Sequence, residues 1–401
     1  MAKYTLKDMK NVLYMHHVSS IGGASYCLLS ILKEIDRKII NPIVLLKEIG
    51  PLKDQIENLG IKVYIFPEML QVPYNRSLIE INSIRSYYKF LNSRSIFDKW
   101  LKKNSINVVY INTMMLYPYL EIAKNNGVKT IIHIREHWPL DQNKIQLKWA
   151  QDAIKKYADI VIAINKYSAS MIPEVKDKTT IVYDWIDMDS RYEYRPLNEI
   201  FGEDTSNLKV YLFTGGVVSL KGGLTIAKTF IHHIKDLDAR LLMLGVDTEI
   251  VYNGWCGMIR KMLSWIGIYS RSDQLRLIVR KDKRIKCIPS SYAIKHIIEQ
   301  CYCMLSFFTI PHANLALAEC LILKTPVVAA ETPESIEYSN NMKLNTLFIM
   351  NNKTDLIEKI KYLNNHYNEE KKVLEKLSGE VKQQFDKKIN IVRINEIINK
   401  I

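Results

Sequence analysis

Short runs of Val, Ile, Leu and Tyr alternate with helical stretches along most of the chain. Each run is apolar throughout rather than at every second position, which is typical of strands buried on both faces of a parallel sheet. The first half contains runs at Val12–His16, Ile43–Leu46, Val63–Phe66, Val108–Ile111, Thr130–Ile134, Ile160–Ala163 and Thr180–Tyr183. The second half contains runs at Val210–Phe213, Leu241–Leu244, Ile285–Ile288, Met304–Phe308, Val327–Ala330 and Thr346–Ile349. The pattern predicts an α/β protein with two doubly wound, Rossmann-like domains.

A polar segment with Pro196, Gly202 and several acidic residues separates the two sets of strands and predicts a linker. The predicted parts are a first domain over 1–190, a linker over 191–208, a second domain over 209–380 and a final helix over 381–401. The final helix is amphipathic, because isoleucines recur in it at helical spacing. No internal repeat or low-complexity tract is present.

Length and composition favour a folded protein with two cores. The chain has 401 residues, of which 48% are hydrophobic and 24% charged. No apolar run is long enough to cross a bilayer, and the start of the chain has no signal-peptide core. The six cysteines fall mostly in apolar runs, which favours reduced core thiols. We therefore expect a cytoplasmic protein, with attachment to the inner face of the cell membrane as a further expectation from its charge.

The formal net charge of +14 predicts anionic partners. No nucleic-acid-binding motif stands out, so no nucleic-acid partner is expected. The basic, aromatic stretch Arg76–Lys103 predicts a long helix, interrupted near Asn92–Ser95. Such a surface suits contact with an anionic membrane, each basic residue adding about 1 kcal/mol near anionic lipid. The alternative is an ordinary solvated helix face.

A second amphipathic helix is predicted within a basic stretch at 250–281. Its apolar residues share one stripe, with Arg260 and Lys261 on the opposite side. The stripe consists of Trp255, Met258, Ile259, Met262, Leu263 and Ile266. Two interpretations remain open, a helix lying in a membrane interface and a helix packed on its own domain.

Polar residues follow two strands of the first domain. After the first strand come His16 and His17, and then Gly22 and Gly23 open a helix. Adjacent glycines let the backbone approach a bound group at a helix start, although a plain tight turn is the alternative. The dinucleotide fingerprint Gly-x-Gly-x-x-Gly is absent, so a dehydrogenase is not expected.

The second polar strand end reads His133-Ile-Arg135-Glu136-His137-Trp-Pro. Five polar or aromatic groups at the end of an apolar strand, followed by proline, are not expected in a core. A guanidinium is costly to bury without a partner, so Arg135 is predicted to line a ligand site. For His133, the alternative is a buried histidine whose hydrogen bonds are made within the core.

In the second domain, Gly215 and Gly216 follow the first strand, and Lys221 precedes a glycine-opened helix. An ammonium group beside a helix N-terminus is suited to a diphosphate, although a structural turn is again the alternative. Two Asp-x-Asp triplets, at Asp187 and Asp236, are interpreted as turn and cap residues. No metal site is predicted.

The stretch from Tyr302 to Glu334 predicts strand, loop, helix and second strand. Asn314, Leu315 and Ala316 follow the loop and lie at the start of the helix, where backbone N–H groups point outward. Glu319 lies about one turn further, where a carboxylate can accept hydrogen bonds from paired hydroxyls such as those of a ribose. A helix with one solvated glutamate is the alternative.

These segments, in this order, resemble the group 1 (family 4) GT-B glycosyltransferases. The resemblance rests on four segments: Gly22-Gly23-Ala24, the exit segment Ile181–Asp187, Gly215 with Lys221-Gly222, and Glu319 followed by Pro326-Val-Val-Ala. The chain departs from the family pattern at four places. Ser25 replaces an acid, Asp184 and Trp185 replace Asn-Gly, Gly216 replaces arginine, and Pro311 replaces the first of two glutamates.

The resemblance implies a GT-B fold with a cleft between the domains and a last helix that crosses back to the first domain. It implies retaining transfer of a sugar from a nucleotide-diphosphate donor to a saccharide or lipid-linked saccharide, in bacterial surface-polysaccharide assembly, without a metal or other cofactor. Arg135, Glu136 and Lys221 would then be catalytic. His17 and His137 would lie on the acceptor side. The donor would be held by Gly22, Gly23, Gly215, Gly216, Lys221, Asn314, Leu315, Ala316 and Glu319.

Two other functions stay open. The departures at Gly216 and Pro311 fit a non-catalytic GT-B subunit that binds nucleotide or acceptor. A nucleotide-sugar epimerase on the same scaffold is the second alternative, although its soluble substrate needs no membrane contact. A subsidiary hypothesis is that Arg135 replaces the charge absent at Gly216.

Overall fold

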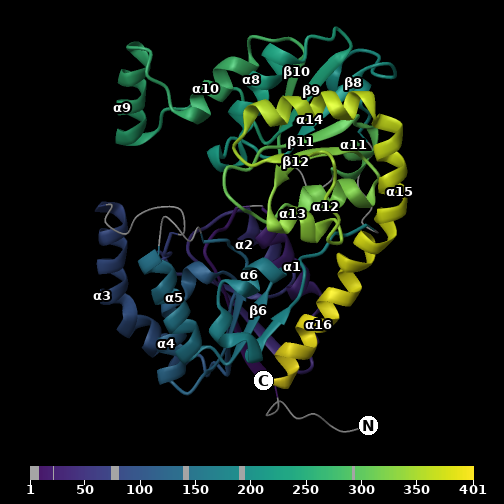
Figure 1. Ribbon diagram of the computed structural model, residues 1–401. Coiled ribbons are helices and arrows are strands. Elements are labelled where there is room, and N and C mark those ends of the chain that lie inside the picture. The colour runs from purple at the N-terminus through teal and green to yellow at the C-terminus, as the bar shows by residue number, and fades with distance from the viewer. Residues whose placement is uncertain (1–8, 21, 74–80, 139–143, 189–194, 291–293) are drawn as a thin grey trace. The chain divides into compact units, whose positions relative to one another are not determined.

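The computed structural model describes residues 9–20, 22–73, 81–138, 144–188, 195–290 and 294–401. The chain divides into two compact units. Unit 1 contains residues 1–185 together with the C-terminal residues 385–401, and unit 2 contains residues 186–384. Figure 1 shows the two units, each built on its own sheet with helices against it.

Unit 1 is built on a seven-stranded parallel sheet in the order β3-β2-β1-β4-β5-β6-β7. The strands are β1 (Lys10–His16), β2 (Ile40–Leu46), β3 (Lys62–Ile65), β4 (Val108–Ile111), β5 (Lys129–Ile134), β6 (Ile160–Ala163) and β7 (Thr179–Ile181). Alternate residues of β1 pack into two different hydrophobic clusters. Leu13 and Met15 belong to one cluster, and Val12 and Tyr14 belong to the other. The sheet is therefore covered on both faces, as continuous apolar strands predict.

The helices of unit 1 connect these strands. They are α1 (Gly23–Glu34), α2 (Pro51–Glu57), α3 (Ile81–Lys103), α4 (Pro118–Asn125), α5 (Lys144–Tyr157), α6 (Lys166–Ser170) and the short 3-10 helices η2 (Met114–Leu116) and η3 (Pro173–Lys178). The interruption predicted near Asn92–Ser95 is wrong, because α3 is continuous. The Ser93 hydroxyl donates to the Phe90 carbonyl at 3.1 Å, so the polar side chain is satisfied without breaking the helix.

The last helix, α16 (Lys387–Lys400), belongs to unit 1. Its isoleucines Ile391, Ile394 and Ile398 are buried in the same cluster as Cys27 and Leu28 of α1. The chain thus returns from unit 2 to pack its C-terminal helix on the first unit, the return that the sequence led us to expect.

Unit 2 is built on a six-stranded parallel sheet in the order β10-β9-β8-β11-β12-β13. The strands are β8 (Lys209–Phe213), β9 (Ala239–Leu244), β10 (Ile285–Ile288), β11 (Cys303–Ser306), β12 (Val327–Glu331) and β13 (Leu347–Ile349). The helices are α7 (Leu197–Phe201), η4 (Ser219–Lys221), α8 (Gly223–His233), α9 (Gly254–Trp265), α10 (Arg271–Val279), α11 (Lys295–Gln300), α12 (Leu315–Ile322), α13 (Pro333–Tyr338), α14 (Lys353–Asn365) and α15 (Tyr367–Gln384). Two parallel, doubly wound sheets confirm the predicted fold class.

Candidate functional site

Each sheet contains one place where the strand order reverses. In unit 2 the reversal lies between β8 and β11, which are neighbours in the sheet although β9 and β10 come between them in sequence. Loops leaving the two strands turn to opposite sides, and ligands of such sheets bind at this point beyond the carboxyl ends. The predicted residues Lys221 and Asn314 follow β8 and β11 respectively. The topology therefore brings the two predicted donor segments to one edge of unit 2.

Direct contacts tie these two loops together. The Thr309 backbone N–H donates to the Leu220 carbonyl at 2.9 Å, and the Thr309 hydroxyl lies 3.2 Å from the same oxygen. Gly222, with φ of +71°, approaches β11 so closely that a Cβ atom there would lie 2.1 Å from the Phe307 carbonyl oxygen. Only glycine fits this position, so the start of α8 is held against the end of β11.

The preceding glycines are also required by local geometry. A Cβ atom on Gly215 would lie 2.3 Å from the Phe213 ring. Gly216 has φ of +62°, and its N–H donates to the Leu244 carbonyl at 3.1 Å. A side chain at Gly216 would need a left-handed backbone, so the arginine of the family pattern does not suit the loop conformation adopted here.

Two ionisable side chains in this part of unit 2, Lys221 and Glu319, have no partner among the described residues. Lys221 is half-buried, and no hydrogen bond or ion pair of its side chain occurs among the described residues. Burial lowers the pKa of its amine. Glu319 is also half-buried and lacks a side-chain partner in the described parts of the chain, and burial raises its pKa to about 7. Since desolvation opposes both charges, these groups are poised to gain from a ligand that supplies opposite charge or hydrogen bonds.

Asn314 is the N-cap of α12, the helix that carries Glu319. Its side chain accepts a hydrogen bond from the Leu317 N–H at 3.3 Å, and its Nδ2 donates to the Ser306 hydroxyl at 2.9 Å. Leu315 and Ala316 form the first turn that follows. Amides of a first helical turn have no acceptor within the helix, so they present N–H groups and a positive dipole end.

In unit 1 the strand order reverses between β1 and β4, and a buried polar cluster follows the strand ends there. Arg135, just after β5, is 5% exposed and forms an ion pair with Asp184. Its Nε donates to Asn112 Oδ1 at 3.0 Å, and its Nη2 lies 3.3 Å from His133 Nδ1. Burial opposes the charge, but the nearby Asp184 carboxylate prevails and raises the pKa of Arg135. The guanidinium is therefore charged and paired, and the expectation that this strand end would lie outside a core is wrong, because Arg135, Glu136 and His137 are all buried.

His16 extends this cluster toward α1. Its Nδ1 lies 3.2 Å from Asn112 Nδ2, and its Nε2 lies 3.2 Å from the Ser25 hydroxyl. Burial is the main cause that holds the pKa of His16 well below its usual value, with the His17 and Arg135 charges adding to it. The imidazole is thus neutral at physiological pH. We call His16, Ser25, Asn112, His133, Arg135 and Asp184 the unit 1 polar cluster.

Glu136 makes structural contacts beside this cluster. It is buried, accepts a hydrogen bond from the Thr113 hydroxyl, and accepts another from the Met114 N–H at 2.8 Å. Burial raises its pKa, although these hydrogen bonds oppose the shift. The carboxylate therefore caps the short helix η2, and a catalytic role for it stays a prediction.

The other residues predicted in unit 1 differ in their exposure. Gly22 and Gly23 are exposed at the start of α1. His17 is half-buried, and burial lowers its pKa to about 4. His137 is buried, with its Nε2 2.8 Å from the Ser168 hydroxyl. Within the described ranges, no group of three or more His, Cys, Asp or Glu side chains is arranged to hold a metal ion.

Of the unit 1 polar cluster, the sequence selected only Arg135 as a site residue, and two of the residues that it missed contact Arg135 directly. Asn112 follows β4 directly, so the signal that selected Arg135, a polar residue after a buried strand, could also have found it. Asp184 was seen as a departure from a family motif, but its pairing with Arg135 depends on β5, β6 and β7 being neighbours.

Comparisons with known proteins give structural but no sequence matches. No protein-family model matches the chain, and no curated protein is significantly similar to it in sequence. HepE of Anabaena, solved in complex with UDP and glucose, has a TM-score of 0.72 at 16% identity, covering 98% of this chain and 100% of that chain. A glycosyltransferase from Rickettsia africae has a TM-score of 0.69 at 16% identity, covering 98% of each chain.

Sucrose-phosphate synthase from Thermosynechococcus elongatus is a more distant neighbour. Its TM-score is 0.66 at 10% identity, and the match covers 98% of this chain and 99% of that chain. All three neighbours are GT-B glycosyltransferases, and the match extends over nearly the whole chain in each case. The protein therefore has the GT-B fold.

Proposed function

We propose that this protein is a glycosyltransferase that moves a sugar from a nucleoside diphosphate to a saccharide or lipid-linked saccharide acceptor. One observation carries the proposal. Lys221 and Glu319, both half-buried and both without a partner among the described residues, follow the two strands at which the order of the unit 2 sheet reverses. Solved neighbours with the same fold contain UDP with glucose, which supports the choice of donor class.

In the proposed reaction, the main task of the protein is to neutralise charge on the leaving diphosphate, and no covalent intermediate with the protein is needed. When the bond from the sugar to the diphosphate breaks, negative charge builds on the leaving diphosphate. The Lys221 ammonium and the first-turn amides of α12, at Leu315 and Ala316, would stabilise that charge. Glu319 would accept hydrogen bonds from the ribose hydroxyls. No metal is needed in this scheme, because the positive groups belong to the chain itself.

The proposal keeps the expected roles for unit 1. Gly22 and Gly23 leave the start of α1 open to a bound group. Arg135 and Glu136 are proposed near the reaction centre, with His17 and His137 on the acceptor side. Because Asp184 already balances Arg135, its charge is not free to replace an arginine at Gly216. Retention of configuration and a role in surface-polysaccharide assembly belong to the proposal as well.

A thermal-shift screen against UDP-, GDP- and ADP-sugars, followed by donor turnover, tests the proposal. A donor that binds the folded protein raises its melting temperature according to its concentration and affinity. We expect one nucleotide class to raise it and the same donor to be hydrolysed or transferred. Lys221→Met should reduce both effects, whereas Lys228→Met, which removes an exposed lysine from α8, should change neither. Failure of every nucleotide sugar to bind would refute the proposal.

A non-catalytic nucleotide-binding subunit is the second candidate. The left-handed Gly216 favours it, because the backbone there does not suit the arginine of active family members. This candidate predicts binding that requires Lys221 but no hydrolysis or transfer. Radiolabelled donor, incubated with and without saccharide acceptors, distinguishes the two candidates.

A further inference from the structure

Helix α9 is attached to unit 2 by its polar side. Gly257 is the buried residue of this helix, and a Cβ atom there would lie 2.6 Å from the backbone of Tyr252. Arg260, one turn further along the same side, stacks over the Tyr252 ring with 5.6 Å between the guanidinium and the ring centroid. The side of α9 that contains Gly257 and Arg260 therefore faces the segment just before the helix.

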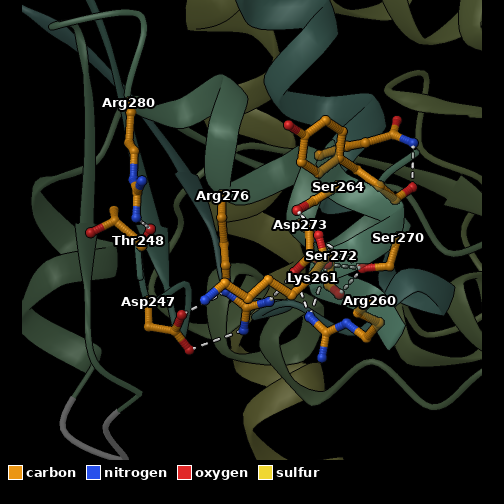
Figure 2. A network of polar contacts seen from close by, with 12 residues as sticks. Asp247, Thr248, Arg260, Lys261, Ser264, Ser270, Ser272, Asp273, Arg276 and Arg280 are labelled. Atoms are coloured by element: carbon orange, nitrogen blue, oxygen red, sulfur yellow. Dashed lines mark hydrogen bonds and ion pairs between the residues drawn. The ribbon is translucent and has the colours of Figure 1, made fainter. Parts of the chain in front are cut away.

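A network of ion pairs holds this orientation (Figure 2). Arg260 Nη2 donates to both Asp273 carboxylate oxygens at 2.7 and 2.8 Å, and the Ser270 hydroxyl donates to the same carboxylate at 2.7 Å. Arg276 connects Asp273 at 3.3 Å with Asp247 at 2.7 Å. Because Asp273 is buried at the start of α10, the network anchors α9 to a rigid helix through charge rather than through apolar packing.

The apolar side of α9 consequently faces outward. Trp255 and Trp265, near its two ends, are 74% and 75% exposed, and Ile266, just after the helix, is 71% exposed. Met258, Ile259, Met262 and Leu263, between them, are also exposed. An amphipathic helix on a globular protein ordinarily buries this stripe, so α9 has the reverse orientation. A contiguous apolar surface of this kind marks an interaction site.

The charges around the stripe are of one sign. From Ile250 to Ser272 the sequence contains no acidic residue, whereas Arg260, Lys261 and Arg271 are basic. Asp273 neutralises Arg260, but Lys261 and Arg271 have no ion pair within the described ranges. Lys261 lies one turn from both Met258 and Trp265, at the border between the polar and apolar sides. Its amine can therefore reach a negative group beside the exposed apolar stripe.

We propose that α9 is a membrane-surface helix that inserts its apolar stripe into the interface of an anionic phospholipid bilayer. Tryptophans near both ends suit the headgroup boundary, and the flanking basic residues match anionic lipid. No helix in the described parts of the chain has the length and apolar character of a transmembrane span, so the contact is peripheral. This inference does not depend on the proposed glycosyl transfer, and its test needs no nucleotide.

Vesicle co-sedimentation of the full chain tests the inference. The protein should bind vesicles of phosphatidylglycerol mixed with phosphatidylethanolamine, and bind phosphatidylcholine vesicles at least tenfold more weakly. The triple variant Trp255→Ser, Met262→Ser, Ile266→Ser should lose at least tenfold in partitioning. Lys261→Glu with Arg271→Glu should lose about tenfold at low salt and less at high salt, since each basic residue near the surface contributes.

A matched control removes equally exposed apolar residues elsewhere. Ile49, Trp149 and Leu237 are 76%, 52% and 90% exposed, and none lies on α9. Their joint replacement by serine should leave vesicle binding unchanged, and circular dichroism should show that both triple variants are folded. Equal binding by the α9 variant and the wild type would overturn the inference. So would a concentration-dependent dimer that the α9 variant abolishes while neither protein binds vesicles, because α9 would then cover a second copy.

Discussion

The two places where the strand order reverses are built from similar parts but differ in how their charges are satisfied. In unit 1, Arg135 is buried and matched by Asp184, Asn112 and His133. In unit 2, Lys221 and Glu319 are half-buried without matching groups from the described residues. The unit 1 polar cluster, whose charges are paired, contributes to folding stability and fixes the conformation of the loops that follow its strands. Groups without partners cost folding energy, and under the proposed function a bound ligand would offset that cost.

The largest expected effect comes from breaking the satisfied cluster. Arg135→Met leaves the Asp184 carboxylate buried and unpaired, which should lower the free energy of unfolding by about 3–5 kcal/mol. Lys221→Met in unit 2 should leave that free energy unchanged or raise it by up to about 1 kcal/mol, because a desolvated ammonium is removed. Urea denaturation of both variants measures the contrast. Similar losses in the two would contradict the distinction between the sites.

A double substitution sharpens the same contrast. Arg135→Met combined with Asp184→Asn removes both buried charges together. The double variant should therefore lose less than the sum of the single losses, with a coupling of about 1–3 kcal/mol. The measurement is a double-mutant cycle in urea. Additive losses would show that the pair is not coupled.

The pH dependence of stability distinguishes Glu319 from ordinary carboxylates. Its folded pKa of about 7 lies above the unfolded value, so the folded state holds its proton more tightly. Glu319 therefore costs stability progressively as pH rises from about 4.5 to about 7, and the full cost persists above that range. Glu319→Gln should raise the melting temperature of the ligand-free protein at pH 8 and change it little at pH 4.5. The same gain at both pH values would contradict this interpretation.

The smallest expected effect compares two glycines. Gly216→Ala should cost about 1 kcal/mol, because alanine resists its left-handed φ of +62°. Gly22→Ala should cost less than about 0.5 kcal/mol, since Gly22 has an extended φ of −161° and a Cβ atom there would meet open space. Melting temperatures of the two variants measure the difference. A larger cost at Gly22 would mean that its turn is more constrained than its backbone indicates.

The fold and the turns beside the candidate donor site followed from local sequence signals. Continuous apolar strands located both sheets, and glycines before a helix located the turns at Gly215 and Gly222. The pairing of Arg135 with Asp184 could not be read in this way, because it depends on which strands are neighbours. The sequence located the apolar stripe of α9 but left its direction open, since helical spacing shows that one side is apolar but not which way that side faces.

Isothermal titration of the donor nucleotide into the wild type, Lys221→Met and Lys228→Met tests the central claim most directly. If the Lys221 amine binds the donor diphosphate, Lys221→Met should weaken binding by about 1.5–3 kcal/mol, roughly 13- to 160-fold, while Lys228→Met binds as the wild type does. Equal affinities for all three proteins would contradict the assignment of the unit 2 strand ends as the donor site.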